Sequence, residues 1–173
     1  MTSFALPSPS SSPRLWEPTE HDFDRSLEIG LDGERRVGLD LFELGYWVIW
    51  PNPPHRAKDP ETFAREKPDL IVLVGGRGIG LEIKHVKTDF SGPDDFPYKT
   101  AFVGKLSRWD KRSDDPWAVV ILSRGPKGGR LVIPVATRGT WVVERQSPPM
   151  LAAPRRCWRT WDWLIERFRH PVI

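Results

Sequence analysis

The sequence between residues 68 and 84 reads Pro68-Asp69-Leu70-Ile71-Val72-Leu73-Val74, then Gly75-Gly76-Arg77-Gly78, then Ile79-Gly80-Leu81-Glu82-Ile83-Lys84. This pattern predicts an apolar strand opened by an acid, a glycine turn and a second strand, folded as a hairpin. Side chains alternate between faces along a strand, so Leu81 and Ile83 share one face while Glu82 and Lys84 share the other. Burying an acid and a base together is costly unless they pair or hold an ion.

The two carboxylates of this hairpin point to a divalent-metal site. The hairpin folds Asp69 and Glu82 towards each other, and their oxygens are hard ligands of the kind that Mg2+ takes, with water in the remaining positions. Lys84, one pleat beyond Glu82, is expected beside the metal-bound water. There it would orient or help to deprotonate that water, or neutralise charge on a phosphate.

The combination of Pro68, Asp69, Glu82 and Lys84 resembles the motif of the PD-(D/E)XK nuclease superfamily, position by position. The resemblance covers roughly residues 31–125. It implies a restriction-endonuclease-like α/β fold with a central mixed β-sheet flanked by helices, which also agrees with the order of the expected elements. It further implies that Asp69 and Glu82 bind Mg2+ or Mn2+, that the Ile83 carbonyl is a further ligand, and that Lys84 positions the attacking water.

A helix is expected from about residue 24 or 31 to residue 44, with Gly45 as its stop. Its apolar stripe consists of Val37, Leu41 and Leu44, and Glu34 falls in line with Leu41. The superfamily often has a glutamate on the first core helix that points at the metal, and Glu34 resembles that residue. The alternative is a first-turn acid favoured by the helix dipole.

A further helix is expected between residues 98 and 112, with an apolar face formed by Tyr98, Phe102, Leu106 and Trp109. Lys105 falls inside this stripe, whereas Lys99 and Arg108 fall outside it. The superfamily often places a Lys or Gln on the helix after the Glu-x-Lys strand, so Lys105 is the candidate for that role, with Lys99 second. The alternative is that Lys105 extends along the edge of the core with its ammonium in water.

The rest of the chain predicts a single nuclease-like domain over residues 23–173 and a Pro/Ser-rich flexible tail over residues 1–22. Strands are expected at residues 46–50, 117–123, 131–135 and 140–144, followed by a proline-rich linker. A last helix carries Trp158, Trp161, Ile165 and Phe168. Its arginines suit contacts to phosphates or an ordinary solvated face.

Charge, cysteine content and missing motifs exclude several classes of function. The formal net charge of +3 is a mild basic bias compatible with a polyanionic partner. Cys157 is the single cysteine, which excludes an intramolecular disulfide and a Cys-based zinc site. No Gly-x-Ser-x-Gly motif supports a serine nucleophile. No membrane partner, membrane span or signal peptide is expected, so we expect a cytoplasmic location.

These observations favour a metal-dependent DNA nuclease, structure-directed or partner-directed, with RNA left open as a substrate. Asp69, Glu82, Lys84, Glu34 and Lys105 are the expected catalytic residues, and Asp69, Glu82, Ile83 and Glu34 the expected metal ligands. A homodimer or a larger nucleic-acid-processing complex is compatible with this interpretation. Two alternatives stay open: a non-catalytic nucleic-acid-binding or assembly subunit that kept the fold, and a hairpin whose Glu82 and Lys84 form a surface ion pair.

Overall fold

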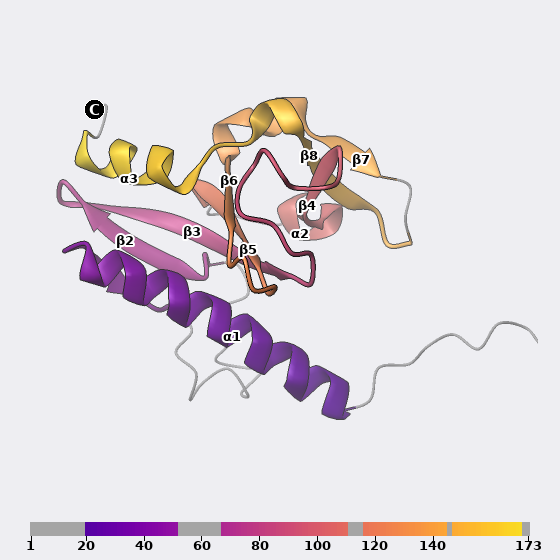
Figure 1. Cartoon of the computed structure of the whole chain (residues 1–173), viewed down its shortest axis with the longest axis horizontal. Helices are drawn as coiled ribbons and strands as arrows, with labels where there is room; N and C mark the ends of the chain where they lie inside the picture. The colour runs from indigo at the N-terminus through magenta and orange to yellow at the C-terminus, as the bar shows by residue number, and fades with distance from the viewer. Residues whose placement is uncertain (1–19, 52–66, 111–115, 145–146, 171–173) are drawn as a thin grey trace, which may run out of the picture.

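The computed structural model describes residues 20–51, 67–110, 116–144 and 147–170, with side chains from residue 30 onwards (Figure 1). Most of the tail expected over residues 1–22 lies outside this range, as does most of the loop between the first two expected strands.

A five-stranded sheet forms the centre of the molecule. Its strands lie in the order β1-β2-β3-β5-β6. The strands are β1 (Trp47–Ile49), β2 (Leu70–Val74), β3 (Arg77–Val86), β5 (Ala118–Ser123) and β6 (Arg130–Pro134). Only β3 and β5 pair in parallel, and the other neighbours are antiparallel. The expected hairpin is β2–β3, and the expected α/β class with a central mixed sheet is confirmed.

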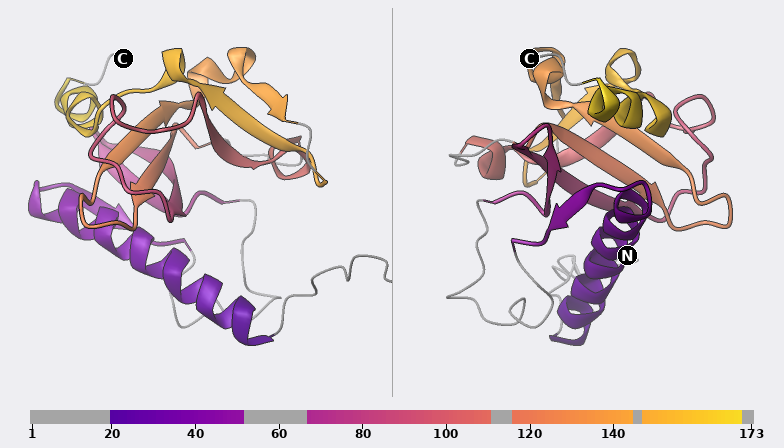
Figure 2. Two further views of the ribbon diagram at one scale, coloured as in Figure 1. Left: turned by 45° about the vertical axis from the view of Figure 1, so that its right-hand side comes forward. Right: turned by 90° about the vertical axis from the view of Figure 1, so that its left-hand side faces the viewer.

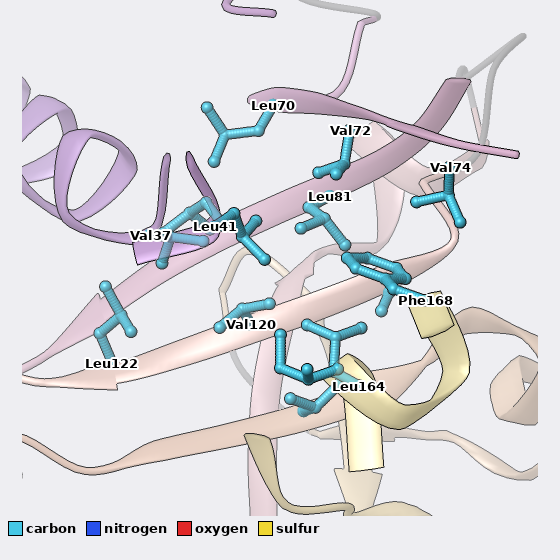
Figure 3. Packing of buried hydrophobic residues seen from close by; sticks show 14 residues of the cluster. Val37, Leu41, Leu70, Val72, Val74, Leu81, Val120, Leu122, Leu164 and Phe168 are labelled. Atoms are coloured by element: carbon cyan, nitrogen blue, oxygen red, sulfur yellow. The ribbon is translucent and has the colours of Figure 1, made fainter. Parts of the chain in front are cut away.

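Two helices cover one face of this sheet (Figures 1 and 2). They are α1 (Glu20–Glu43) and α3 (Trp161–Arg169). Their apolar residues share a core with the side chains of the strands, as Figure 3 shows for Val37 and Leu41 from α1 and Phe168 from α3. Leu81 and Ile83 belong to this core, so the alternation predicted for the Glu-x-Lys strand is correct. Thr160 caps α3 by accepting a hydrogen bond from the Trp163 backbone at 3.1 Å.

The opposite face is partly covered by a second, three-stranded sheet with the order β4-β8-β7. Its strands are β4 (Thr100–Lys105), β7 (Val142–Glu144) and β8 (Met150–Pro154). The short helix α2 (Leu106–Asp110) follows β4 directly, and 3-10 turns occupy Val135–Thr140 and Arg155–Cys157. A second core between the two sheets contains Val119 and Ile121 of β5 together with buried aromatic residues: Phe90, Phe96, Trp109, Trp141 and Trp158.

The helix expected over residues 98–112 is wrong, because a strand occupies its first half. In β4, Ala101 and Val103 are buried while Phe102 is exposed, which is a period of two rather than of a helix. Gly104 then adopts φ +145°, a conformation open to glycine, beside a register shift against β8. The helix α2 begins only after this irregularity.

Three other expected boundaries also differ. The proline-rich segment contains strand β8, because Pro148 and Pro149 precede it and Pro154 is its last residue. The first helix begins at Glu20, and Leu44, expected in its buried stripe, is 48% exposed because the helix has already ended. Trp158 lies before α3 and packs in the second core. None of the helices in the described part of the chain combines the length and apolar composition of a bilayer-spanning segment.

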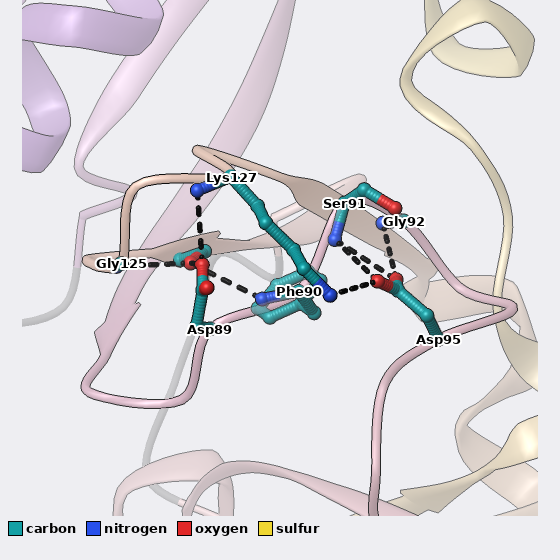
Figure 4. Close-up of polar contacts among 8 residues, drawn as sticks. Asp89, Phe90, Ser91, Gly92, Asp95, Gly125 and Lys127 are labelled. Atoms are coloured by element: carbon teal, nitrogen blue, oxygen red, sulfur yellow. Dashed lines mark hydrogen bonds and ion pairs between the residues drawn. The ribbon is translucent and has the colours of Figure 1, made fainter.

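A polar clamp fastens the loop after β3 to the turn between β5 and β6 (Figure 4). Asp95 accepts hydrogen bonds from the backbone of Ser91 at 2.8 Å and Gly92 at 3.0 Å, and from Lys127 Nζ at 3.0 Å. Asp89 accepts the backbone N–H of Lys127 at 3.0 Å. The hydrogen bonds from Gly92, Lys127 and Ser91 hold the pKa of Asp95 well below its usual range. The clamp closes the loop that carries Phe90 over the second core.

The edge strands of the five-stranded sheet are β1 and β6. β1 has only three residues, and its partner on the inner side is β2. On the other side, Val132 of β6 exchanges two backbone hydrogen bonds with Arg159, at 3.0 and 2.8 Å. The segment before α3 therefore covers part of the outer edge of β6.

Candidate active site

The position of Asp69 is set by the close approach of two chain segments. Asp69 comes directly before β2, whose first residue, Leu70, pairs with Leu81 of β3. Pro68 packs against Gly80 so closely that a Cβ at Gly80 would lie 2.8 Å from the Pro68 Cγ. The carboxylate of Asp69 then reaches the backbone of β3, where its Oδ2 accepts the N–H of Ile83 at 2.7 Å. Glycine at position 80 therefore allows the acid to lie across the hairpin.

Glu82 is a buried acid that contacts two cations. Its side chain is 1% exposed on the face of β3 opposite the helix-covered core. Lys84 Nζ lies 2.5 Å from Glu82 Oε1, and Arg108 Nη1 lies 3.1 Å from the same oxygen. Both cations are partly exposed, so their charges lie between the buried acid and solvent. Charged groups in this arrangement form stronger hydrogen bonds than neutral ones.

Glu34 joins these residues from α1. The helix passes close over β3, since a Cβ at Gly33 would lie 3.3 Å from Nδ1 of His85. Burial, together with the negative charges of Asp69 and then Glu82, raises the pKa of Glu34 to about 8, against the opposing charges of Lys84 and Arg108. A half-buried Glu34 therefore lies within the electrostatic reach of both hairpin carboxylates.

The same crowding affects Asp69. Burial and the neighbouring charge of Glu82 raise its pKa to about 6, although Lys84 and the hydrogen bond from Ile83 act in the opposite direction. When Glu34, Asp69 and Glu82 are all ionised, their three negative charges exceed the two positive charges of the nearby cations. A bound cation would offset this repulsion and favour the ionised carboxylates.

The donor set fits a hydrated hard cation. Among the described residues, no group of three or more His, Cys, Asp and Glu side chains forms a ready cage for a metal. Mg2+ does not require such a cage, because it usually keeps several waters and binds through one or two carboxylates. Asp69 and Glu82 supply these two carboxylates, with Glu34 nearby. A closed zinc site would need nitrogen or sulfur ligands that this cluster does not contain.

The structure brings together four of the expected site residues: Glu34, Asp69, Glu82 and Lys84. The side chain of Ile83 packs in the helix-covered core, and its backbone N–H contacts Asp69. Lys105 is exposed at the end of β4, where it pairs with Met150 of the second sheet. The cations that act on the acids are Lys84 and Arg108.

Arg108 is the site residue that sequence reasoning missed. A continuous helix over residues 98–112 places it off the apolar stripe, whereas the helix that begins at Leu106 brings it to Glu82. The signal in the sequence is Gly104, which interrupts the expected helix two residues before α2. Trp109, the residue after Arg108, is buried in the second core and fixes α2 there.

Comparison with known proteins finds similarity among solved structures and no match among family profiles or curated sequences. Among solved structures, the bacterial homing endonuclease I-Ssp6803I is similar with a TM-score of 0.47 and 14% sequence identity. The similarity covers 83% of this chain and 93% of that chain.

Proposed function

We propose that the protein is a metal-dependent nuclease that hydrolyses phosphodiester bonds in DNA. The observation that carries this proposal is the convergence of Glu34, Asp69 and Glu82 with Lys84 and Arg108. Asp69 and Glu82 raise the pKa of Glu34, and Glu82 raises that of Asp69. Such crowding of acids is unfavourable for the fold alone, so the cluster is better explained by a cation that it binds. The resemblance of the hairpin to the PD-(D/E)XK motif supports the same chemistry.

Asp69 and Glu82 would hold Mg2+ or Mn2+, with the Ile83 carbonyl as a further ligand by resemblance and Glu34 bound directly or through water. When bound, such an ion lowers the pKa of a coordinated water and stabilises the charge on the phosphate. The Ile83 N–H holds the Asp69 carboxylate in place, so this carboxylate does not need to reorganise when the ion binds.

The two cations have separate roles in this proposal. Lys84 Nζ contacts Glu82 and is partly open to solvent. In this proposal its ammonium would orient the attacking water. Arg108 keeps further N–H donors beyond the one directed at Glu82, and a guanidinium suits a phosphate oxygen that gains charge in the transition state. Arg108 takes the place that the resemblance implied for Lys105.

The test is cleavage of labelled nucleic acids in Mg2+, Mn2+ or EDTA. The panel contains linear duplex, single-stranded, nicked, flap and four-way-junction DNA, together with single-stranded RNA. We expect metal-dependent cutting that falls by about 100-fold or more in Asp69→Asn and Lys84→Met. Asp94→Asn, which changes an exposed acid in the loop after β3, serves as the matched control. Full activity in Asp69→Asn would refute the assignment.

A second measurement does not depend on cutting. If the acids bind a metal, Mn2+ should raise the melting temperature of the protein, and Glu82→Ala should abolish this increase. An unchanged melting temperature in Mn2+ would leave Glu82 and Lys84 as a structural ion pair. Binding of DNA without cutting in any metal would instead favour a nucleic-acid-binding subunit.

A further inference from the structure

The sheet face that carries the acids is covered only over part of its width. The second core covers β5 and β6, whereas β1 and β2 expose apolar side chains on this face. Trp47 is 73% exposed and pairs with Leu73, which is 41% exposed. The alternating residues Val48 and Val72 point to the other face and pack in the helix-covered core. Apolar side chains thus remain open beside the candidate active site.

A groove of about 460 Å3 lies on this face of β2 and β3. Its lining includes Pro68, Ile71, Gly78, Gly80 and Trp117, and none of the lining residues in the described part of the chain is charged. Pro68 directly precedes Asp69, and Gly80 lies two residues before Glu82 on the same face of β3. Two residues of a strand span about 6.6 Å, a distance of the order of one nucleotide. Two lining residues of the groove are therefore close neighbours of the two carboxylates along the chain.

Trp117 forms one wall of the groove and belongs to an aromatic stack. Its backbone N–H donates to the Gly80 carbonyl at 2.7 Å, which fixes it beside β3. Its ring stacks on Trp163 of α3, with centroids 5.6 Å apart and planes at 12°, and the Arg167 guanidinium lies 5.6 Å from the Trp163 ring. Trp163 and Arg167 line a neighbouring cavity with Trp117 but do not line the groove. Trp117 thus lines both cavities.

We propose that this groove binds an unpaired nucleobase of the strand whose phosphate lies at the carboxylates, with the base stacked on Trp117. This inference rests on the proposed nuclease function and specifies its substrate class as single-stranded or locally unpaired nucleic acid. The described lining residues carry no charge, which suits a base and disfavours a phosphate, while Lys84 and Arg108 provide cations at Glu82. A base inside a duplex has both faces covered by its neighbours, whereas an unpaired base presents a face to an aromatic ring.

Binding to uncut nucleic acid tests the groove separately from catalysis. Fluorescence anisotropy measures the affinity for a labelled single-stranded oligonucleotide in EDTA and in Ca2+. This affinity is compared with the affinities for an oligonucleotide of abasic sites and for a duplex. Stacking of one base on an aromatic ring corresponds to about a 5- to 150-fold change in affinity. We expect Trp117→Ala to weaken single-strand binding within this range, Trp117→Phe to retain most of it, and duplex binding to change little.

Tyr98→Ala removes another exposed aromatic ring, in the segment before β4, and is the matched control with unchanged affinity. Circular dichroism and melting temperature establish that each variant is folded. Equal single-strand affinity in wild type and Trp117→Ala, or no single-strand binding by the wild type, would overturn the inference. So would a dimer in sedimentation velocity that Trp117→Ala dissociates without loss of nucleic-acid binding, because the face would then join two copies of the chain.

The two proposals can fail independently. If the wild type cuts nucleic acid and Trp117→Ala binds and cuts single strands equally well, the groove assignment fails and the nuclease stands. If no substrate is cut in any metal but Trp117→Ala loses single-strand affinity, the nuclease fails and the groove binds nucleic acid in a protein of another function.

Discussion

Replacing Glu34 by Gln should stabilise the protein at alkaline pH and leave it nearly unchanged at acidic pH. The carboxyl of Glu34 has its pKa raised from 4.5 to about 8 by burial and by Asp69 and Glu82. The folded protein therefore keeps a proton that the unfolded chain releases, and its stability falls as the pH rises from about 4.5 to about 8. Gln cannot ionise, so the variant does not show this loss.

The magnitude follows from the two pKa values. Their difference corresponds to at most roughly 5 kcal/mol above the folded-state pKa. Solvent still reaches the half-buried side chain and screens its neighbours, so on the order of 2 kcal/mol is a realistic expectation. For a chain of 173 residues this corresponds to about 4–8 °C in melting temperature.

The assay is thermal unfolding of wild type and Glu34→Gln between pH 5 and 9, in EDTA. The two melting curves should nearly coincide at pH 5 and separate progressively towards pH 8.5, with the variant more stable. Glu43→Gln, which alters an exposed glutamate at the end of the same helix, should follow the wild type. A difference between Glu34→Gln and wild type that stays constant across this pH range would refute the electrostatic coupling of Glu34 to the hairpin acids.

Three further changes test the surroundings of the site. Gly80→Ala places a Cβ 2.8 Å from Pro68 Cγ, so we expect a loss of about 1–3 kcal/mol in chemical denaturation and a fall in cleavage as Asp69 is displaced. Arg108→Leu removes one cation from Glu82 and should lower the cleavage rate by about 10- to 100-fold in single-turnover kinetics, while wild-type activity would count against its role. Thr160→Ala removes the N-cap of α3 and should cost about 1 kcal/mol in urea unfolding without affecting cleavage, whereas an unchanged midpoint would contradict the cap.

The hairpin could be predicted from the sequence because its signals are local. A strand opened by Asp69, a glycine turn and the alternation of Leu81, Glu82 and Ile83 fix the faces of β3 without reference to the rest of the chain. Glu34 is also recognisable, because an acid in line with Leu41 on an apolar helix face is unusual. These residues form most of the candidate site.

Arg108 and the second sheet depend on contacts between distant parts of the chain. Phe102 and Leu106 fit a helical stripe, but β4 forms because it pairs with β8, from which it is separated by more than forty residues. Prolines around residues 148–154 make the partner strand look like a linker. Once that pairing is missed, the helix is extended backwards through Gly104, and Lys105 rather than Arg108 is assigned to the acids.

The outer strands of the five-stranded sheet determine how copies of this protein can associate. An unpaired strand edge is a template for pairing with another chain and for aggregation. Here β1 offers only three residues before Trp50-Pro51, and β6 has its outer backbone bonded to Arg159 and ends at Pro134. Main-chain pairing between copies is therefore limited at both edges, so a chain that leaves Trp47 in solvent can do so with little risk of extending its sheet into a filament.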